Sequence, residues 1–215
     1  KTVAFVYLGA SSSSLTNASG LATVSYNAGS NAGTIGFTAT FTEDATYMTS
    51  SDTAKTATVV KRPTALAGVS VPAVFTNRIF TASATLTDIR LSGALSGKTV
   101  AFVYLGASSS SLTNALGLAT VTYDAGPSSG TKSLTATFTT DSTYMTSSDT
   151  AKTVVVDPRP SSLAAQNVLS VFANEVLTTS ATLTDLGGGG GVSGKTVAFV
   201  FLGQNANGTT IGSGL

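Results

Sequence analysis

The 215-residue sequence contains no cysteine, no histidine and no tryptophan. Without cysteine it can have neither a disulfide framework nor a thiolate metal site. Without histidine it lacks the usual zinc and iron ligand and the usual general base near neutral pH. These absences argue against an enzyme, and we expect no catalytic residue, no cofactor and no bound metal ion.

Charge is also scarce. Only 10% of the residues are Asp, Glu, Lys or Arg, against about 25% in a typical soluble protein. The net charge of +1 leaves no basic surface for nucleic acid, so no nucleic-acid partner is expected. A surface rich in Ser and Thr with so little charge repels other copies weakly. It is either the exterior of a secreted protein or a surface buried in an assembly.

Long hydrophobic runs are missing as well. No uninterrupted apolar segment approaches the ~20 residues that span a bilayer, so no membrane-spanning segment is expected. The first residues, Lys-Thr-Val-Ala-Phe, lack the layout of a signal peptide. If the protein is exported, its signal lies outside this sequence.

The sequence does contain a long internal repeat. The segment Lys-Thr-Val-Ala-Phe-Val-Tyr-Leu-Gly begins at Lys1 and again at Lys98, and it returns at Lys195 with Phe201 in place of Tyr. Residues 1–97 align with 98–194 without a gap and differ at 33 of 97 positions. A period of this length matches one compact domain, so the pattern indicates tandem duplication.

Within each repeat the apolar residues alternate with polar ones. In the central copy Phe80, Ala82, Ala84 and Leu86 are predicted to face inward, with Thr and Ser between them facing outward. Turn residues separate such runs, and no segment has helical periodicity. About seven short strands per repeat predict an all-β fold of tandem antiparallel β-sandwiches. The expected strands are 65–71, 80–87, 99–105, 118–124, 132–139 and 150–156, with a further short strand near Leu112.

Arg-Pro pairs mark the joints between repeats, at Arg62-Pro63 and Arg159-Pro160. Proline removes an amide donor and stiffens the chain, so strands end there. We expect a complete domain at 62–158, the C-terminal part of a domain at 1–61, from its third strand onward, and the N-terminal part of another at 159–215. Such part-domains are explained either by truncation of a longer repeat protein, the simpler account, or by strand complementation between subunits, in which residues 159–194 complete the next copy.

Three segments of the central copy carry a family resemblance. They are residues 97–102 (Gly-Lys-Thr-Val-Ala-Phe), 115–121 (Ala-Leu-Gly-Leu-Ala-Thr-Val) and 134–148. Together they resemble the bacterial Ig-like repeat domains, although Thr140 and Glu43 stand where that family usually has glycine. The resemblance implies a tandem module of secreted or surface-anchored proteins such as adhesins, stalks and surface layers, and it implies no particular ligand.

One loop motif recurs as Asp44 with Tyr47 and as Asp141 with Tyr144. It is either a ligand or cation site, or a structural turn in which Asp binds backbone amides and Tyr packs beneath the loop. We favour the structural interpretation. A calcium site normally needs two or more carboxylates close together, and the acidic pair at Glu43 is not repeated.

Two further features concern the surface. Asn17 and Asn207 begin N-glycosylation sequons, neither of which recurs in the matching repeat position. In the repeated strand Ala101, Val103 and Leu105 are predicted to face outward, where a solvated sheet normally has polar residues. These three are candidates for an assembly face, unless a neighbouring loop at 108–116 covers them.

Two classes of function follow. The first is a non-enzymatic structural segment of an extracellular or cell-surface repeat protein that forms a stalk, fibre or self-assembling filament, with copies of itself as partners. The second is an adhesin module whose domain-end loops bind carbohydrate or a host protein. The absence of Trp, and of Tyr or Phe in the loops that vary, counts against the second.

Overall fold

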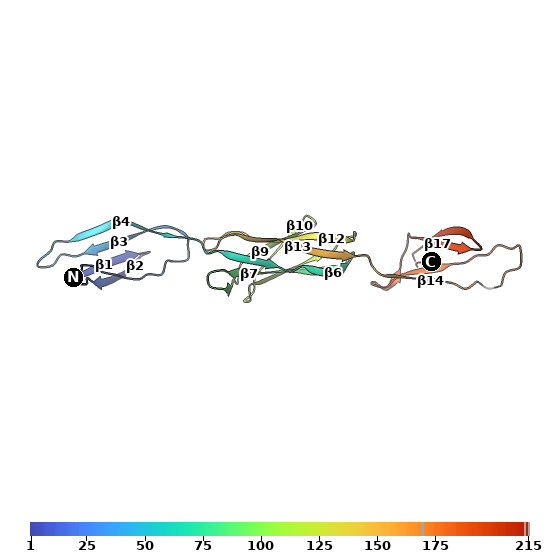
Figure 1. Cartoon of the computed structure of the whole chain (residues 1–215), viewed down its shortest axis with the longest axis horizontal. Helices are drawn as coiled ribbons and strands as arrows, with labels where there is room; N and C mark the ends of the chain where they lie inside the picture. Colours follow the sequence, from blue (N-terminus) through green and yellow to red (C-terminus); the bar gives the residue numbers. More distant parts are fainter. Residues whose placement is uncertain (169, 213, 215) are drawn as a thin grey trace. The chain divides into compact units, whose positions relative to one another are not determined.

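The computed structural model describes residues 1–168, 170–212 and 214. Throughout these residues the regular structure is β-strand, with no helix (Figure 1). The all-β fold predicted from the sequence is therefore confirmed. The chain divides into two compact units, one made of Lys1–Val69, Ser83–Val121 and Thr135–Lys152, the other of Ser70–Ala82, Thr122–Leu134 and Thr153–Leu215.

The first sheet belongs to the first unit and has the strand order β2-β1-β3-β4. Neighbouring strands are antiparallel throughout. Residues 16–32, between β2 and β3, form no strand. The strands are β1 (Thr2–Tyr7), β2 (Ala10–Leu15), β3 (Gly33–Phe41) and β4 (Ser50–Val59).

Two sheets form the central sandwich. One has the order β10-β9-β12-β13-β6, and the other the order β11-β7-β5 with β8 paired to β7. The first contains β6 (Val71–Phe75), β9 (Thr99–Tyr104), β10 (Ala107–Leu112), β12 (Gly130–Phe138) and β13 (Ser147–Asp157). The second contains β5 (Thr64–Gly68), β7 (Ile79–Asp88), β8 (Gly93–Ala94) and β11 (Leu118–Asp124).

Alternate side chains of these strands form the core. The inward set predicted for β7 is confirmed, because Phe80, Ala82, Ala84 and Leu86 are all buried. β9 contributes Val100, Phe102 and Tyr104 to the same core, each at most 1% exposed. Burying a large apolar side chain contributes about 1.5–3 kcal/mol, so these rows account for much of the stability of the sandwich.

The expected single strand at 65–71 is wrong. The segment forms two strands in different sheets, since β5 pairs with β7 and β6 pairs with β13. The chain changes sheets after Gly68, whose N–H donates to Asp149 Oδ2 (2.9 Å) on β13. The β6–β13 pair is parallel, so the sandwich is not purely antiparallel.

Polar segments are also more regular than predicted. Residues 107–112, expected to be mainly a connection, form β10, and β13 begins three residues earlier than expected. β10 and residues 147–149 at the start of β13 have no apolar face and depend on pairing with a neighbouring strand, so the alternation of apolar residues does not reveal them.

The C-terminal region belongs to the second unit. A three-stranded sheet has the order β14-β15-β16, and β17 forms a separate antiparallel hairpin with β18. Their residues are β14 (Ser161–Ala165), β15 (Ala181–Asp185), β16 (Gly190–Gly191), β17 (Thr196–Phe201) and β18 (Gln204–Thr209).

Candidate functional site

The loop after β12 contains the repeated Asp-Tyr motif. Asp141 Oδ1 accepts hydrogen bonds from the N–H groups of Thr143 (2.8 Å) and Tyr144 (2.7 Å). Its Oδ2 accepts one from Lys98 Nζ (2.6 Å), which also lies 4.9 Å from the centre of the Tyr144 ring. The carboxylate thus joins the loop to the residue that precedes β9.

The first copy repeats this geometry. Asp44 Oδ1 accepts from the N–H groups of Thr46 (2.8 Å) and Tyr47 (2.9 Å), and Lys1 Nζ lies 2.5 Å from Asp44 Oδ2. Lys1 Nζ is 5.0 Å from the centre of the Tyr47 ring. The same side chains therefore make the same contacts 97 residues apart.

These contacts favour the ionised carboxylates. The hydrogen bond from Lys1, followed by that from Thr46, lowers the pKa of Asp44 from 3.8 to about 2. Burial raises the pKa of Asp141, but the hydrogen bonds from Lys98 and the loop amides outweigh it and leave that pKa below its ordinary value. With lysine and backbone donors already at their oxygens, these carboxylates are poorly placed as cation ligands.

No group of three or more His, Cys, Asp or Glu side chains that could hold a metal ion occurs among the described residues. Nor do those residues include a helix long and apolar enough to cross a membrane.

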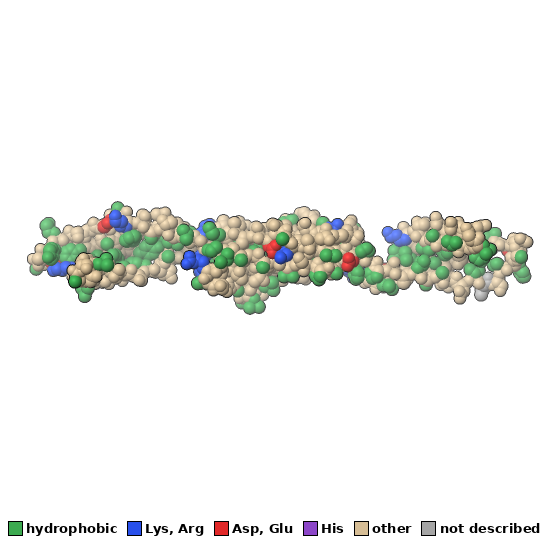
Figure 2. All heavy atoms as spheres, in the orientation of Figure 1, with side chains coloured by type: hydrophobic (Ala, Val, Ile, Leu, Met, Phe, Trp, Pro, Cys, Tyr) green, Lys and Arg blue, Asp and Glu red, His purple; other side chains and the backbone are tan. Residues whose placement is uncertain are grey.

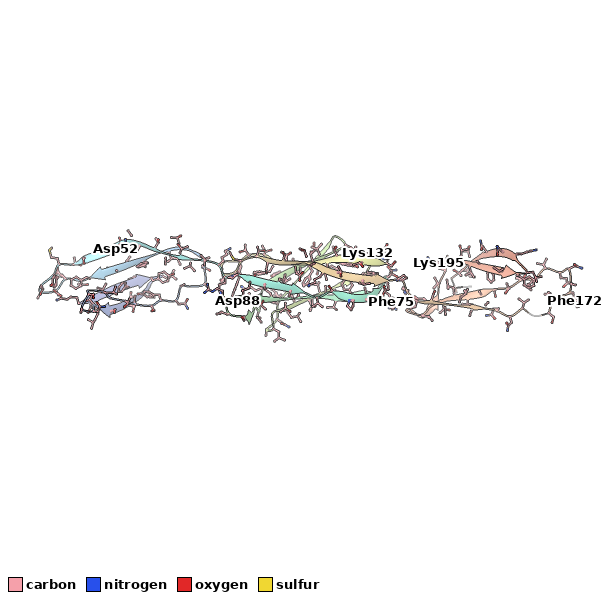
Figure 3. The ribbon with its side chains drawn as sticks, viewed as in Figure 1. Asp52, Phe75, Asp88, Lys132, Phe172 and Lys195 are labelled. Atoms are coloured by element: carbon pink, nitrogen blue, oxygen red, sulfur yellow. The ribbon has the colours of Figure 1, made fainter. Side chains whose placement is uncertain are left out.

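A second charged feature, not anticipated from the sequence, lies at the Arg-Pro joints. Arg62 pairs with Asp88, which is only 2% exposed and is labelled in Figure 3. Asp88 Oδ1 also accepts from the N–H groups of Arg90 (2.9 Å) and Leu91 (3.3 Å). The guanidinium lies 5.7 Å from the Tyr144 ring, so the joint and the loop motif share one aromatic side chain.

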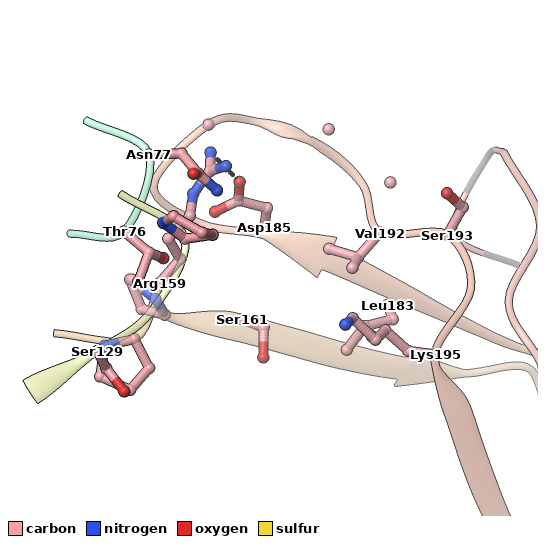
Figure 4. A pocket seen from close by; sticks show the side chains of 16 residues that line it. Thr76, Asn77, Ser129, Arg159, Ser161, Leu183, Asp185, Val192, Ser193 and Lys195 are labelled. Carbon is pink, nitrogen blue, oxygen red and sulfur yellow. Dashed lines mark ion pairs between the residues drawn. The ribbon is translucent and has the colours of Figure 1, made fainter. Parts of the chain in front are cut away.

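The joint is repeated in the second unit, where Arg159 pairs with Asp185 (Figure 4). A cavity of about 840 Å³ surrounds this pair. A Cβ on Gly188 would collide with the Arg159 guanidinium, so the glycine run leaves room for the pair. The signal for both joints was the recurrence of Arg-Pro together with Asp at the end of β7 and β15.

Lining residues of this cavity are mostly small or polar, and none is aromatic. They include Thr76, Asn77, Ser129, Ser161, Ser193 and Lys195. The volume of the cavity is within the range of small-molecule sites. It lacks an aromatic side chain on which a sugar ring could stack.

An apolar groove lies on the first sheet. Its volume is about 620 Å³, and Phe5, Tyr7, Tyr26 and Phe37 are among its lining residues. Tyr26 Oη donates to the backbone oxygen of Phe5 (2.7 Å). In the central sandwich β11 is held by pairing with β7. Residues 21–27, its counterpart in the first copy, have no such partner strand and form no ladder.

The outward residues of the repeated strand lie in two different environments. Ala101 and Val103 are exposed on β9, and Val103 is 39% exposed. Charged side chains are few and scattered among uncharged ones on the face shown in Figure 2.

Leu105 lies beyond the end of the strand, in the two-residue turn to β10. That turn has an unusual backbone. Leu105 and Gly106 both have positive φ, at 48° and 81°, as a type I′ hairpin turn requires. The same pair of angles recurs at Leu8-Gly9 and Leu202-Gly203. Asn-Gly is the usual sequence at such a turn, and leucine there carries a steric cost.

The two sequon residues differ in their surroundings. Asn17 lies in a turn, where its Oδ1 accepts from the N–H groups of Ser19 (2.9 Å) and Leu21 (3.0 Å). Asn207 lies on β18 opposite Ala198. Both are exposed.

Comparison with known proteins gives distant structural likeness only. No protein-family model matches the chain, and no curated protein matches it. Domains of a 1.5-MDa bacterial ice-binding adhesin, studied for host cell surface retention, align with 99% of this chain and 72% of their own at 16% identity and a TM-score of 0.36.

Two other structures align similarly. A Ca2+-stabilized adhesin that helps an Antarctic bacterium reach out and bind ice covers 99% of this chain and 55% of its own, at 16% identity and a TM-score of 0.33. Domains 4–9 of the surface layer protein SbsC cover 92% and 37%, at 14% identity and a TM-score of 0.28. TM-scores this low assign neither a fold family nor a function.

Proposed function

We propose that this chain is a non-enzymatic structural segment of an extracellular or cell-surface repeat protein, built from repeats of 97 residues that act as spacers in a stalk or fibre. The observation that carries the proposal is the use of charge. The ion pairs of the described residues are three pairs, each made twice at this spacing: Lys1–Asp44 and Lys98–Asp141, Lys55–Asp52 and Lys152–Asp149, Arg62–Asp88 and Arg159–Asp185.

Each of these pairs lies in a turn, on a strand or at a joint of the fold. Catalytic sites instead collect titratable groups with perturbed pKa values in a cleft. Here the lowered pKa values of Asp44, Asp141 and Asp149 have structural causes, namely lysine partners and backbone N–H groups. Each kind of ion pair therefore recurs in a second copy and lies within the scaffold, which supports a structural role.

The strand order of the central sandwich supports the finer assignment to an immunoglobulin-like domain. If β5, β7, β9, β11, β12 and β13 are taken as strands A, B, C, E, F and G, the sheets are A-B-E and C-F-G. That division is the one found in immunoglobulin-like sandwiches. On this assignment 62–158 is a whole domain, and 1–61 and 159–215 are parts of two others.

Mechanical extension of single molecules tests the spacer role. We expect the central domain to resist force and then unfold in one step that lengthens the chain by about 30 nm, since each residue spans at most ~3.3–3.6 Å when extended. Antibodies against the chain should also label intact cells of the source organism. Gradual extension without a step would contradict the proposal.

The adhesin alternative makes a different prediction. Domain-end loops that bind carbohydrate would give saturable, equimolar binding on a glycan array, and replacing Asn77 and Ser129 at the cavity would abolish it. The spacer role predicts no such binding.

A further inference from the structure

The strand β10 is an edge of its sheet, and β2 is the matching edge in the first copy. Both have the sequence Ala-Ser-Ser-Ser-Ser-Leu, at Ala107–Leu112 and Ala10–Leu15. An edge strand presents a row of backbone N–H and C=O groups that no neighbouring strand satisfies. The chain therefore carries two identical edges of this kind.

The hairpin register determines which groups point outward. In the two-residue turn the N–H of Ala107 donates to the backbone oxygen of Tyr104, and hydrogen-bonded pairs then alternate along the strands. Thr113 N–H, which donates to the oxygen of Lys98 (2.9 Å), fits this alternation. The backbone groups of Ser109 and Ser111 consequently face β9, and those of Ser108 and Ser110 face away from it.

Devices that normally protect an edge are missing from β10. It contains no charged residue and no proline, and its register with β9 is unbroken by a bulge. The opposite edge of the same sheet, β6, contains Pro72. In the other sheet the β5 edge is covered at Gly68, whose N–H donates to Asp149 (2.9 Å).

Side chains beside this edge leave room for another strand. Ser108 and Ser110 lie opposite Val103 and Ala101 on the outward face of the hairpin. All four are short and exposed. An approaching strand therefore meets neither a long side chain nor a charge.

We propose that β10 is a self-association surface, to which β10 of a second copy of this chain adds in antiparallel register about a two-fold axis. Each outward residue offers one donor and one acceptor, so the edge is complementary to itself in that arrangement. The two five-stranded sheets become continuous across the pair. Because β2 repeats the edge, one chain has two such surfaces.

This inference rests on the proposed structural role and supplies its partner and its surface. Amide hydrogen exchange of the 215-residue chain tests it directly. In dilute solution the amides of Ser109 and Ser111 exchange slowly and those of Ser108 and Ser110 rapidly. When the concentration is raised until sedimentation shows dimers, exchange at Ser108 and Ser110 slows about tenfold or more.

Proline substitution supplies the matched test. Ser13→Pro with Ser110→Pro removes an outward donor from each edge and leaves the bonds to β1 and β9 intact. The dissociation constant should rise about tenfold or more. The control, Ser13→Ala with Ser110→Ala, keeps both donors and should associate as the wild type does. If the proline variant does not fold, Ser13→Lys with Ser110→Lys replaces it, because like charges facing across the edge oppose pairing.

Three outcomes overturn the proposal. They are a wild-type chain that stays monomeric at millimolar concentration, a proline or lysine variant that associates normally, and an alanine variant that loses association equally. The spacer role is tested separately by the single step in mechanical unfolding. A monomer shows that step as well, so the two proposals can fail independently.

Discussion

Leucine at the first position of a type I′ turn is the clearest local conflict between sequence and backbone. Leu8, Leu105 and Leu202 all adopt φ between 46° and 49° and are exposed. The left-handed conformation costs a residue with a Cβ about 1–2 kcal/mol. Since little of each side chain is buried in its own unit, burial does not offset that cost.

We expect Leu105→Asn to stabilise the central sandwich by about 0.5–1 kcal/mol, because asparagine tolerates this conformation. Urea unfolding followed by circular dichroism measures the change. Leu112→Asn is the control, since Leu112 is exposed but lies on a strand, where asparagine is unfavourable. A loss of stability in Leu105→Asn would mean that the leucine makes contacts that hold the turn.

The Asp-Tyr loop predicts a dependence on acid. Because the folded pKa of Asp141 lies below its ordinary value, its contribution is present above the unfolded pKa, about 3.9, and is lost as pH falls through the folded pKa. Asp141→Asn should cost about 0.5–1 kcal/mol at pH 7. The difference from wild type should shrink between about pH 5 and pH 2.

Lys98→Met removes the cation of the same ion pair. The loss in free energy of unfolding that it causes should therefore disappear over the same pH range. Unfolding by urea at a series of pH values checks both variants. A wild-type advantage that is as large at pH 2 as at pH 7 would show that the pair does not stabilise through charge.

Residue types that act locally could be read from the sequence, and backbone conformations could not. In a common type of turn, an aspartate side chain accepts hydrogen bonds from the N–H groups two and three residues later. The loop at Asp141 is of this type and was therefore predictable. The turn at Leu105 was missed because Leu-Gly lacks the Asn-Gly signal for a type I′ turn. Leu105 continues the alternation of the preceding strand, so the sequence predicted it as the last residue of that strand.

At the scale of elements, the turn that ends in Gly117 fixes β11 against β7. Gly117 has φ of 73°, and its backbone oxygen accepts the N–H of Leu86 (2.9 Å). A Cβ there would lie 2.5 Å from the oxygen of Leu86. The turn has no room for any side chain.

Gly117→Ala should therefore destabilise the sandwich by more than about 2 kcal/mol. Gly106→Ala is the matched control, because Gly106 has a similar φ of 81° but open space around it, and should cost only about 1 kcal/mol. Thermal unfolding of both variants measures the difference. Equal losses would mean that backbone conformation, and not contact with β7, accounts for the effect.

The Arg-Pro joint predicts a large effect from one charge. Arg62→Met leaves Asp88 buried without a cation, which should cost about 3 kcal/mol. Arg90→Met is the control. Arg90 is exposed and lies two residues after Asp88, so this substitution removes the same charge without removing the cation paired with Asp88. Urea unfolding of the two variants, compared at pH 7, tests the role of the pair. Similar losses in both would mean that Asp88 is satisfied by the backbone alone.

Elements with an apolar face were predicted well, and those defined by a neighbour were not. The run at 80–87 alternates cleanly and corresponds to β7. The run at 65–71 has no residue that marks a change of sheet, because that change depends on β13 and Asp149, more than 75 residues away. Long-range pairing of this kind has no local signal in one sequence.

For the whole molecule, the absence of histidine and cysteine removes every side chain that normally titrates between pH 5 and 8. We expect the free energy of unfolding to be constant over this range and to fall below about pH 4, where the carboxylates with lowered pKa become protonated. Urea unfolding at half-unit pH intervals checks this. A slope near pH 6.5 would contradict it.

The placement of the ion pairs also bears on how such a protein changes length. Arg62 with Asp88, Lys98 with Asp141 and Lys152 with Asp149 all close within residues 62–158. Unequal recombination that adds or deletes 97 residues in this frame separates none of these three pairs. The number of repeats can therefore change while each remaining copy keeps these three pairs.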